Sequence, residues 1–356
     1  DRSPSRGLGD VYKRQILNKL KADTQYEVLV RNVDPDVAVE IANKYHGVAA
    51  DRQDIRQYPN GAIGENVVGK VSMDGHGQFG FEAARDTELT GIDGQSTEDV
   101  SADGQVIPGT LRDVVDTVDG RDVTLTLDLD LQTYVQQKLE KAKANSKASG
   151  AEAVVLDAAT GQVLAMANTD TVDPNKNVED QLDEGKDFEN RSVSHPYEPG
   201  SVAKVVTAAA ALQEGVTTPD EVHQVPGSID MAGVTVNDAW EHGTEPYTTT
   251  GIFGKSSNVG TLMIADKLGQ EKYAEYLKKF GLGNTTGIEL PNESAGSVPD
   301  LEQWSGGTFA NLPIGQGQSW TTLQMASVYQ ALANGGERIE PRIIDSVKGP
   351  DGKDEK

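Results

Sequence analysis

The sequence has 356 residues, and its 32 Lys and Arg against 56 Asp and Glu give a formal net charge of −24 at pH 7. This charge disfavours binding to nucleic acid or to anionic lipid, because both depend on basic patches. Cysteine is absent and only five histidines occur, without an H-E-x-x-H pair, which excludes disulfides, thiolate catalysis and cysteine-type zinc sites and disfavours a zinc hydrolase.

The first 50 residues predict a tail followed by two short elements. Residues 1–15 fit nothing that follows and resemble translated adaptor sequence, so we interpret them as a non-native or disordered tail. The apolar run over 26–30 favours a strand, and the spacing of apolar residues over 35–45 favours a helix. No run reaches the roughly 20 apolar residues of a membrane span, so we expect none within this sequence.

Glycines dominate the next stretch. Gly75, Gly77 and Gly80 match G-x-G-x-x-G, which in a dinucleotide site opens directly onto a helix. Residues 82–85 are too short and too charged to be such a helix, so we interpret these glycines as a turn. Residues 91–121 are rich in Gly, Asp, Ser and Thr, which predicts surface loops or a connection between domains.

Regular elements are predicted from residue 123 onward. Alternation over 123–128 favours a strand, and residues 131–147 favour an amphipathic helix with Leu131, Tyr134, Val135 and Leu139 on one face. Two apolar runs, 152–157 and 162–167, flank a short turn and predict a hairpin. The polar, acidic stretch over 170–198 predicts a long irregular excursion, of the kind that in compact domains tends to be functional or disordered.

A serine and a lysine follow this excursion at a spacing that suits catalysis. Ser201 comes directly after Pro199 and Gly200, and a helix-prone run begins there, so Ser201 is expected near a helix N-terminus. Lys204 lies three residues on, on the same helical face and among apolar neighbours that should lower its pKa. A serine beside such an amine is an activated nucleophile. The alternative is a chance S-x-x-K match with Ser201 as an ordinary helix cap.

The region after this helix supplies a second motif. Ser256, Ser257 and Asn258 form an S-x-N triplet that leads into an apolar helix over 261–268. Further helices are predicted over 271–280 and 321–334, a loop over 291–306, and a strand with a charged tail over 338–356.

S-x-x-K followed downstream by S-x-N is much more specific than either motif alone. Together with YEPGSVAK (197–204), KSSNVG (255–260), FGLGNTTGIELPNE (280–293) and LPIGQGQSWTTLQMA (312–326), the sequence resembles a class B penicillin-binding protein. Residues 56–82 resemble the pedestal domain of the actinobacterial division-type members, and the likeness covers about residues 20–345.

This resemblance implies an α+β protein with two domains. A β-rich, dimerisation-type pedestal is expected over 16–117, and a β-lactamase-like transpeptidase domain, an antiparallel sheet flanked by helices, over 118–356. The family's third motif, K-[TS]-G, has no match, since Lys348-Gly349-Pro350 lacks the hydroxyl. We therefore expect a fragment that lacks both the family's membrane anchor and its final strands.

The resemblance also implies a reaction, peptidoglycan D,D-transpeptidation in septal cell-wall synthesis. Ser201 would attack the D-Ala-D-Ala end of a lipid II-derived stem peptide, and Lys204 would take its proton. Ser256 would relay that proton to the departing amine, and Asn258 would bind the peptide and help to hold Lys204. β-Lactams would be trapped on the serine. No metal or organic cofactor is implied, and the expected partners are divisome membrane proteins at the outer face of the cell membrane.

Three alternatives stay open at this point. A Ser-His-Asp triad with His195 lacks a G-x-S-x-G elbow. A β-lactamase-like hydrolase would need a deacylating carboxylate, for which Glu293 lies in the right region although its surroundings favour a solvated or structural role. The chain could also be a non-catalytic fragment whose pedestal binds division partners.

Overall fold

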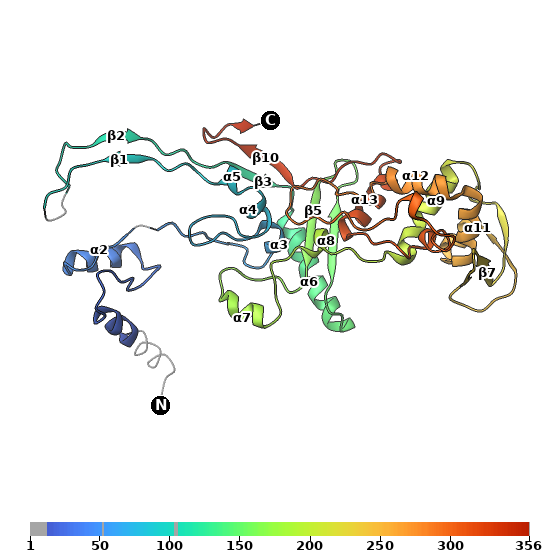
Figure 1. Ribbon diagram of the computed structural model, residues 1–356, viewed down its shortest axis with the longest axis horizontal. Coiled ribbons are helices and arrows are strands. Elements are labelled where there is room, and N and C mark those ends of the chain that lie inside the picture. Colours follow the sequence, from blue (N-terminus) through green and yellow to red (C-terminus); the bar gives the residue numbers. More distant parts are fainter. Residues whose placement is uncertain (1–12, 52, 103–105, 356) are drawn as a thin grey trace, which may run out of the picture. The chain divides into compact units, whose positions relative to one another are not determined.

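The computed structural model describes residues 13–51, 53–102 and 106–355. Its contacts divide the chain into two compact units, residues 1–57 and 58–356 (Figure 1). Within the described residues, no helix is both long and apolar enough to cross a membrane. Most of the predicted tail over 1–15 lies outside the described residues, whereas residues 13–15 begin a helix that runs to residue 20.

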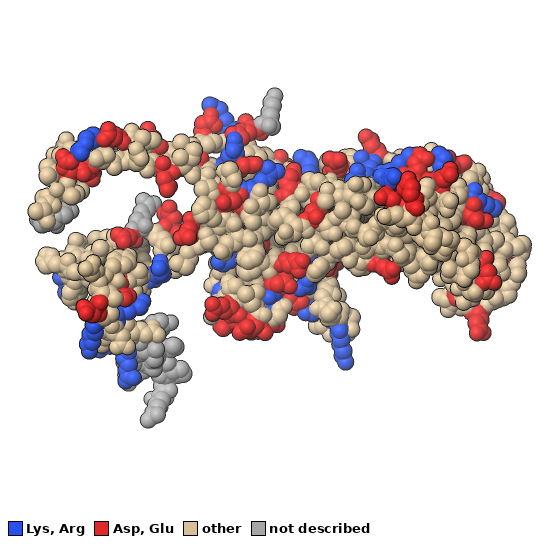
Figure 2. Space-filling view, viewed as in Figure 1, with Lys and Arg blue, Asp and Glu red and all other residues tan. Residues whose placement is uncertain are grey.

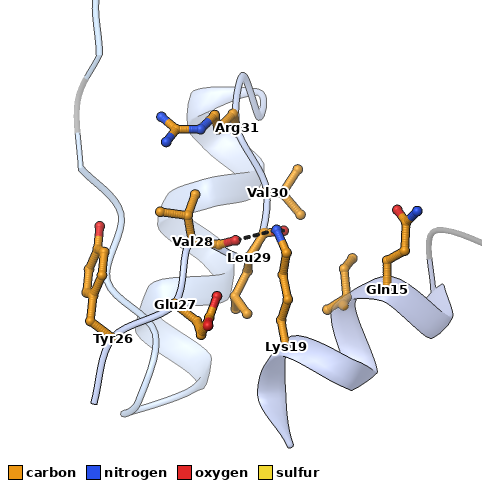
Figure 3. Close-up of a pocket in the computed structure, with 9 residues that line it drawn as sticks. Gln15, Lys19, Tyr26, Glu27, Val28, Leu29, Val30 and Arg31 are labelled. Carbon is orange, nitrogen blue, oxygen red and sulfur yellow. Dashed lines mark hydrogen bonds between the residues drawn. The ribbon is translucent and has the colours of Figure 1, made fainter. Parts of the chain in front are cut away.

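The described residues of the first unit form two helices, and the first of these lines a hollow together with residues 26–31. Helix α2 (Pro35–Lys44) begins at Asp34, whose side chain accepts hydrogen bonds from the first turn, and the predicted helix is confirmed. The predicted strand over 26–30 is wrong, because no described strand pairs with this segment. Instead, Lys19 Nζ donates a hydrogen bond of 2.7 Å to Val28 O across a hollow of about 590 Å³ (Figure 3).

The second unit begins with short helices and a ribbon: α3 (Glu65–Val68), α4 (Gly80–Ala84), α5 (Asp86–Leu89), β1 (Gln95–Thr97) and β2 (Arg112–Val115). The glycine turn is confirmed, since a Cβ on Gly77 would lie 2.0 Å from Glu82 O and α4 has only five residues. The expectation of surface loops or a connection over 91–121 is wrong at residues 95–97 and 112–115, because these form β1 and β2, which pair antiparallel. Every residue of both strands is exposed, so no apolar alternation marked them.

Two further sheets contain the strands that follow this ribbon in the chain. Strands β3 (Asp122–Leu125), β10 (Ile344–Lys348) and β11 (Asp354–Glu355) form an antiparallel sheet in the order β11-β10-β3. The predicted hairpin is confirmed as β4 (Glu152–Leu156) and β5 (Val163–Asn168), paired antiparallel from Glu152 with Asn168 onward.

Helix α6 (Leu129–Ser146) packs on β5 with a polar face. The predicted helix is confirmed, but its predicted apolar face is wrong at Tyr134, which is 59% exposed. Gln132 is buried instead. Its side-chain amide accepts from Met166 N at 2.8 Å and donates to Met166 O at 3.0 Å, completing the hydrogen bonds of β5 along its edge.

The remaining elements surround the two motifs. Strand β6 (Val222–Val225) pairs antiparallel with β9 (Glu245–Thr248), and β7 (Ser228–Met231) forms a hairpin with β8 (Val234–Asn237). The helical elements are η1 (Gly200–Ala203), α9 (Lys204–Gln213), α10 (Thr249–Gly254), α11 (Asn258–Leu268), α12 (Gln270–Lys279), η2 (Leu301–Gln303), η3 (Leu312–Ile314) and α13 (Thr322–Ala333). Residues of α9, α12, α13 and η3 share one buried apolar cluster that includes Tyr273 and Trp320, so α9 is anchored on its apolar side.

The acidic excursion contains two short helices, α7 (Val178–Asp183) and α8 (Arg191–Ser194). Acidic side chains gather over α7 on the visible face (Figure 2). Glu179, Asp180 and Asp183 are all exposed, so the acidic side chains of α7 lie in solvent.

Candidate active site

Residues 197–200, which precede Ser201, are hydrogen-bonded to the loop over 315–320. Tyr197 and Trp320 exchange both backbone hydrogen bonds, each 3.0 Å long, and Gly200 N donates to Gly315 O at 3.0 Å. A Cβ on Gly315 would lie only 1.9 Å from Gly200 O, so the two backbones are in direct contact. Ser201 therefore emerges from a turn fixed on both sides, and its side chain is exposed.

Lys204 begins α9, one helical turn after Ser201, and its backbone N–H donates to Ser201 O. The residue is only 3% exposed. Its Nζ donates hydrogen bonds to Ser256 O at 2.7 Å, Ser256 Oγ at 3.0 Å and Asn258 Oδ1 at 2.7 Å. The structure thus brings together three of the four predicted site residues across more than 50 positions of sequence.

Burial changes the basicity of this amine. Removal of Lys204 from water lowers its pKa from 10.5 to about 8, and the negative charge of Asp238 opposes part of that change. A lysine with this pKa can release its proton near physiological pH, which an ordinary surface lysine cannot do efficiently.

The S-x-N triplet forms a tight turn between α10 and α11. Ser256 has a φ of +58°, a left-handed conformation that costs about 1–2 kcal/mol for a residue with a Cβ. Ser257 is the N-cap of α11 and accepts from Gly260 N at 2.8 Å. Asn258 Nδ2 donates to Asn237 O at 3.0 Å, so its amide oxygen points to Lys204. The strained turn is therefore held by bonds on both sides.

No hydrogen bond joins Ser201 Oγ to Lys204 Nζ among the residues that the structure describes. A protonated amine has three N–H groups, and the oxygens of Ser256 and Asn258 occupy all three. A neutral amine has two N–H groups and a lone pair that can accept a proton, so the predicted transfer from Ser201 requires the neutral form.

The residues of two alternative mechanisms are engaged elsewhere. His195 Nε2 lies 3.3 Å from Glu189 Oε1, and both side chains are largely exposed. Glu293 accepts from Thr286 N at 2.6 Å and from Thr286 Oγ1 at 2.5 Å, which gives it a structural role in that turn. Within the described part of the chain, no group of His, Asp and Glu side chains could hold a metal ion.

Comparison with known proteins identifies the family. The family model described as "Penicillin binding protein transpeptidase domain" matches residues 151–356, more than half of the chain. The chain belongs to this family. A second model, "Penicillin-binding Protein dimerisation domain", matches residues 8–125. The predicted class B family and its α+β fold, a pedestal followed by a transpeptidase domain, are confirmed.

Individual relatives agree with this assignment. Penicillin-binding protein PbpB of Mycobacterium tuberculosis is 56% identical over 337 residues, which are 95% of this chain and 49% of the relative. Peptidoglycan D,D-transpeptidase FtsI of Escherichia coli is 32% identical over 90% of this chain and 53% of the relative. The crystal structure of apo penicillin-binding protein 3 from M. tuberculosis superposes with a TM-score of 0.78 at 54% identity, over 86% of this chain and 65% of that one. The chain therefore spans about half the length of these curated relatives.

Sequence reasoning missed two residues beneath the S-x-N turn. Asp238 follows β8 and accepts from Ser257 Oγ at 2.7 Å and from Val259 N at 3.0 Å. His242 Nε2 lies 3.0 Å from Asp238 Oδ2, and both side chains are almost fully buried. The sequence offered one indication of this pair, an aspartate and a histidine four residues apart.

Proposed function

We propose that this chain carries the serine acyl-enzyme chemistry of a peptidoglycan D,D-transpeptidase. The observation that carries the proposal is a buried Lys204, one turn after an exposed Ser201, whose Nζ is held by Ser256 and Asn258. A lysine of lowered pKa that is bonded to two polar side chains, beside a serine at a helix start, has the parts that nucleophilic catalysis requires.

In the first half of the reaction, neutral Lys204 accepts the hydroxyl proton of Ser201. Ser201 Oγ then bonds to the carbonyl carbon between the two terminal D-alanines of a stem peptide. The C–N bond to the last D-alanine breaks, and the departing nitrogen takes a proton through Ser256 Oγ, which lies 3.0 Å from Lys204 Nζ. The product is an ester between Ser201 and the shortened peptide.

In the second half, an amine of a neighbouring stem peptide attacks this ester. Its proton passes back through Ser256 and Lys204 to Ser201 Oγ, and a cross-link forms. Asn258 is proposed to bind the peptide while its amide oxygen orients Lys204. Because the amide nitrogen of Asn258 donates to Asn237 O, the side chain is already aligned before substrate binds.

The same serine is proposed to react with β-lactams, since a relative forms complexes with two of them. Penicillin-binding protein 3 of M. tuberculosis has been crystallised with aztreonam and with ampicillin, and each structure is 54% identical to this chain where they align. By the same likeness we propose a role in septal wall synthesis at the outer face of the membrane, with division proteins as partners of the pedestal.

Labelling with a fluorescent penicillin tests the proposal. We expect a covalent adduct that mass spectrometry assigns to Ser201, and none in Ser201→Ala. Because the sequence contains no K-[TS]-G, this chain is labelled beside Penicillin-binding protein PbpB of M. tuberculosis as a reference. A folded chain that takes up no label while the reference does would refute the catalytic function and favour the second candidate, a protein that binds division partners without chemistry.

A further inference from the structure

A buried carboxylate lies directly beneath the S-x-N turn. The side chain of Asp238 is 0% exposed. One of its oxygens accepts from Val259 N at 3.0 Å, and the other accepts from Ser257 Oγ at 2.7 Å. These two donors flank Asn258, whose amide oxygen bonds Lys204. The position of Asp238 therefore fixes where Asn258 and Ser256 meet the lysine.

The carboxylate of Asp238 is bound by hydrogen-bond donors and not by a lysine or arginine of the described residues. Burying an ionised carboxylate is costly unless donors or cations compensate it. No lysine or arginine within the described residues forms an ion pair with Asp238, and its hydrogen-bond donors are Ser257, Val259 and His242. The charge nevertheless acts on Lys204, whose pKa it raises against the effect of burial. One side chain thus joins the shape of the turn to the protonation of the amine.

His242 holds this carboxylate from the other side. Its Nε2 lies 3.0 Å from Asp238 Oδ2, and its ring stacks on Trp240 with centroids 5.2 Å apart. Its Nδ1 is buried and has no partner in the described part of the chain. Nε2 is therefore the ring nitrogen that donates to Asp238. His242 then serves as a fixed donor.

Two charged side chains lie on the aromatic neighbours of His242. Lys255 Nζ lies 5.6 Å from the ring centre of Trp240 and 4.6 Å from that of Tyr247, on the two aromatic rings that contact His242. Glu245 is engaged by the hydroxyl of Tyr247.

We infer that Asp238 is a positioning residue for Lys204 and the S-x-N turn, and that His242 holds the Asp238 carboxylate in place. This inference rests on the proposed acyl-enzyme function. Asp238 contacts no reacting atom. It sets the geometry of the acceptors around the lysine and supplies a buried negative charge that acts on it.

Asp238→Asn separates this role from plain structural support. The change keeps one carbonyl oxygen for the turn but removes the charge, so the apparent pKa of Lys204 should fall by about one pH unit. Two readouts follow it: the titration of Lys204 by lysine ¹³Cε NMR, assigned with Lys204→Gln, and the pH profile of penicillin acylation at Ser201. The matched control is Asp230→Asn, at an exposed position of strand β7, which pairs with β8.

The expected result is a profile whose rising limb moves to lower pH, with a maximal rate lowered about tenfold by the disturbed turn. A Lys204 titration that is the same in Asp238→Asn and Asp230→Asn would overturn the inference. That titration needs no penicillin, so it is separable from the proposed function. Lack of acylation in the parent protein, with the titration still shifted, would overturn only the function.

Two variants of His242 test the inference independently, should Asp238→Asn fail to fold. His242→Leu leaves the charge but removes the donor, so acylation should slow about threefold or more without a change in the Lys204 midpoint. His242→Gln keeps an N–H donor and should restore most of the rate. Equal rates in His242→Leu and His242→Gln would contradict the holding role of His242.

Discussion

Replacing Gly315 with alanine should disturb the turn that presents Ser201. Gly315 has a φ of +86°, and a Cβ there would lie 1.9 Å from Gly200 O and 2.5 Å from Gly200 C. These are backbone atoms, so no side-chain rotation can relieve the contact. The Gly200 peptide must move, and Ser201 is attached to it. Gly317→Ala is the matched control, because Gly317 has a φ of +74° but its added Cβ would meet only Leu312 Cδ2, at 4.0 Å.

The two variants share one cost and differ in another. A left-handed alanine costs about 1–2 kcal/mol at either position. Gly315→Ala also breaks the 3.0 Å bond from Gly200 N to Gly315 O, worth about 1 kcal/mol, and shifts a packed segment. We expect Gly315→Ala to lower the free energy of unfolding by about 3–4 kcal/mol, and the control Gly317→Ala to lower it by about 1–2 kcal/mol. At roughly 2–4 °C per kcal/mol, the melting temperatures should differ by about 4–8 °C.

Acylation should separate the variants further. A displacement of about 1 Å at a reacting group can lower a rate about 100-fold, so Gly315→Ala should label Ser201 far more slowly than Gly317→Ala does. Thermal unfolding and the rate of fluorescent-penicillin labelling measure the two effects. Equal melting temperatures and equal labelling rates for the two variants would refute the idea that the contact of Gly315 with Gly200 positions Ser201.

Three further predictions concern single side chains. Because burial lowers the pKa of Lys204 from 10.5 to about 8, the unfolded chain holds a proton that the folded chain has lost between these values. The free energy of unfolding should therefore rise with pH across that interval by about 3 kcal/mol, and urea unfolding of Lys204→Gln should lack this rise. Gln132→Leu should lower the free energy of unfolding by about 1–3 kcal/mol, because Met166 N loses its partner while Met166 O keeps the donor Asn66 Nδ2 at 3.3 Å. Gln137→Leu on the exposed face of α6 should lower it by under about 0.5 kcal/mol in the same assay. Glu293→Gln should lower stability by about 1 kcal/mol and leave the release of bound penicillin unchanged, and a block of release would instead revive the hydrolase alternative.

Local patterns in the sequence predicted the elements that carry the motifs. Ser201 and Lys204 are three residues apart, and the hairpin β4–β5 and helices α9 and α12 follow from short-range apolar spacing. The bond from Lys204 to Asn258 spans 54 positions. No local pattern contains it, so only the resemblance to a family could predict it.

The failures have a common physical cause, because polar and exposed residues carry no periodic signal. Strands β1 and β2 expose both faces, so the alternation that marks a half-buried strand is absent. On α6 the buried positions are Gln132 and Gln136, which a hydrophobicity pattern assigns to solvent. Asp238 was missed for the same reason, since an aspartate becomes significant only once the fold has buried it.

The balance of forces on Lys204 explains how one lysine can both hold the site and serve as a base. With a pKa of 10.5, roughly one amine in 3,000 would be neutral at pH 7; with a pKa of about 8, roughly one in ten is neutral. Burial therefore removes most of the free-energy cost of forming the base. The charge of Asp238 limits this decrease in the pKa of Lys204. The resting amine therefore stays mostly protonated and donates to three acceptor oxygens. A substrate that covers the exposed Ser201 would exclude more water and favour the neutral amine, so deprotonation would follow binding.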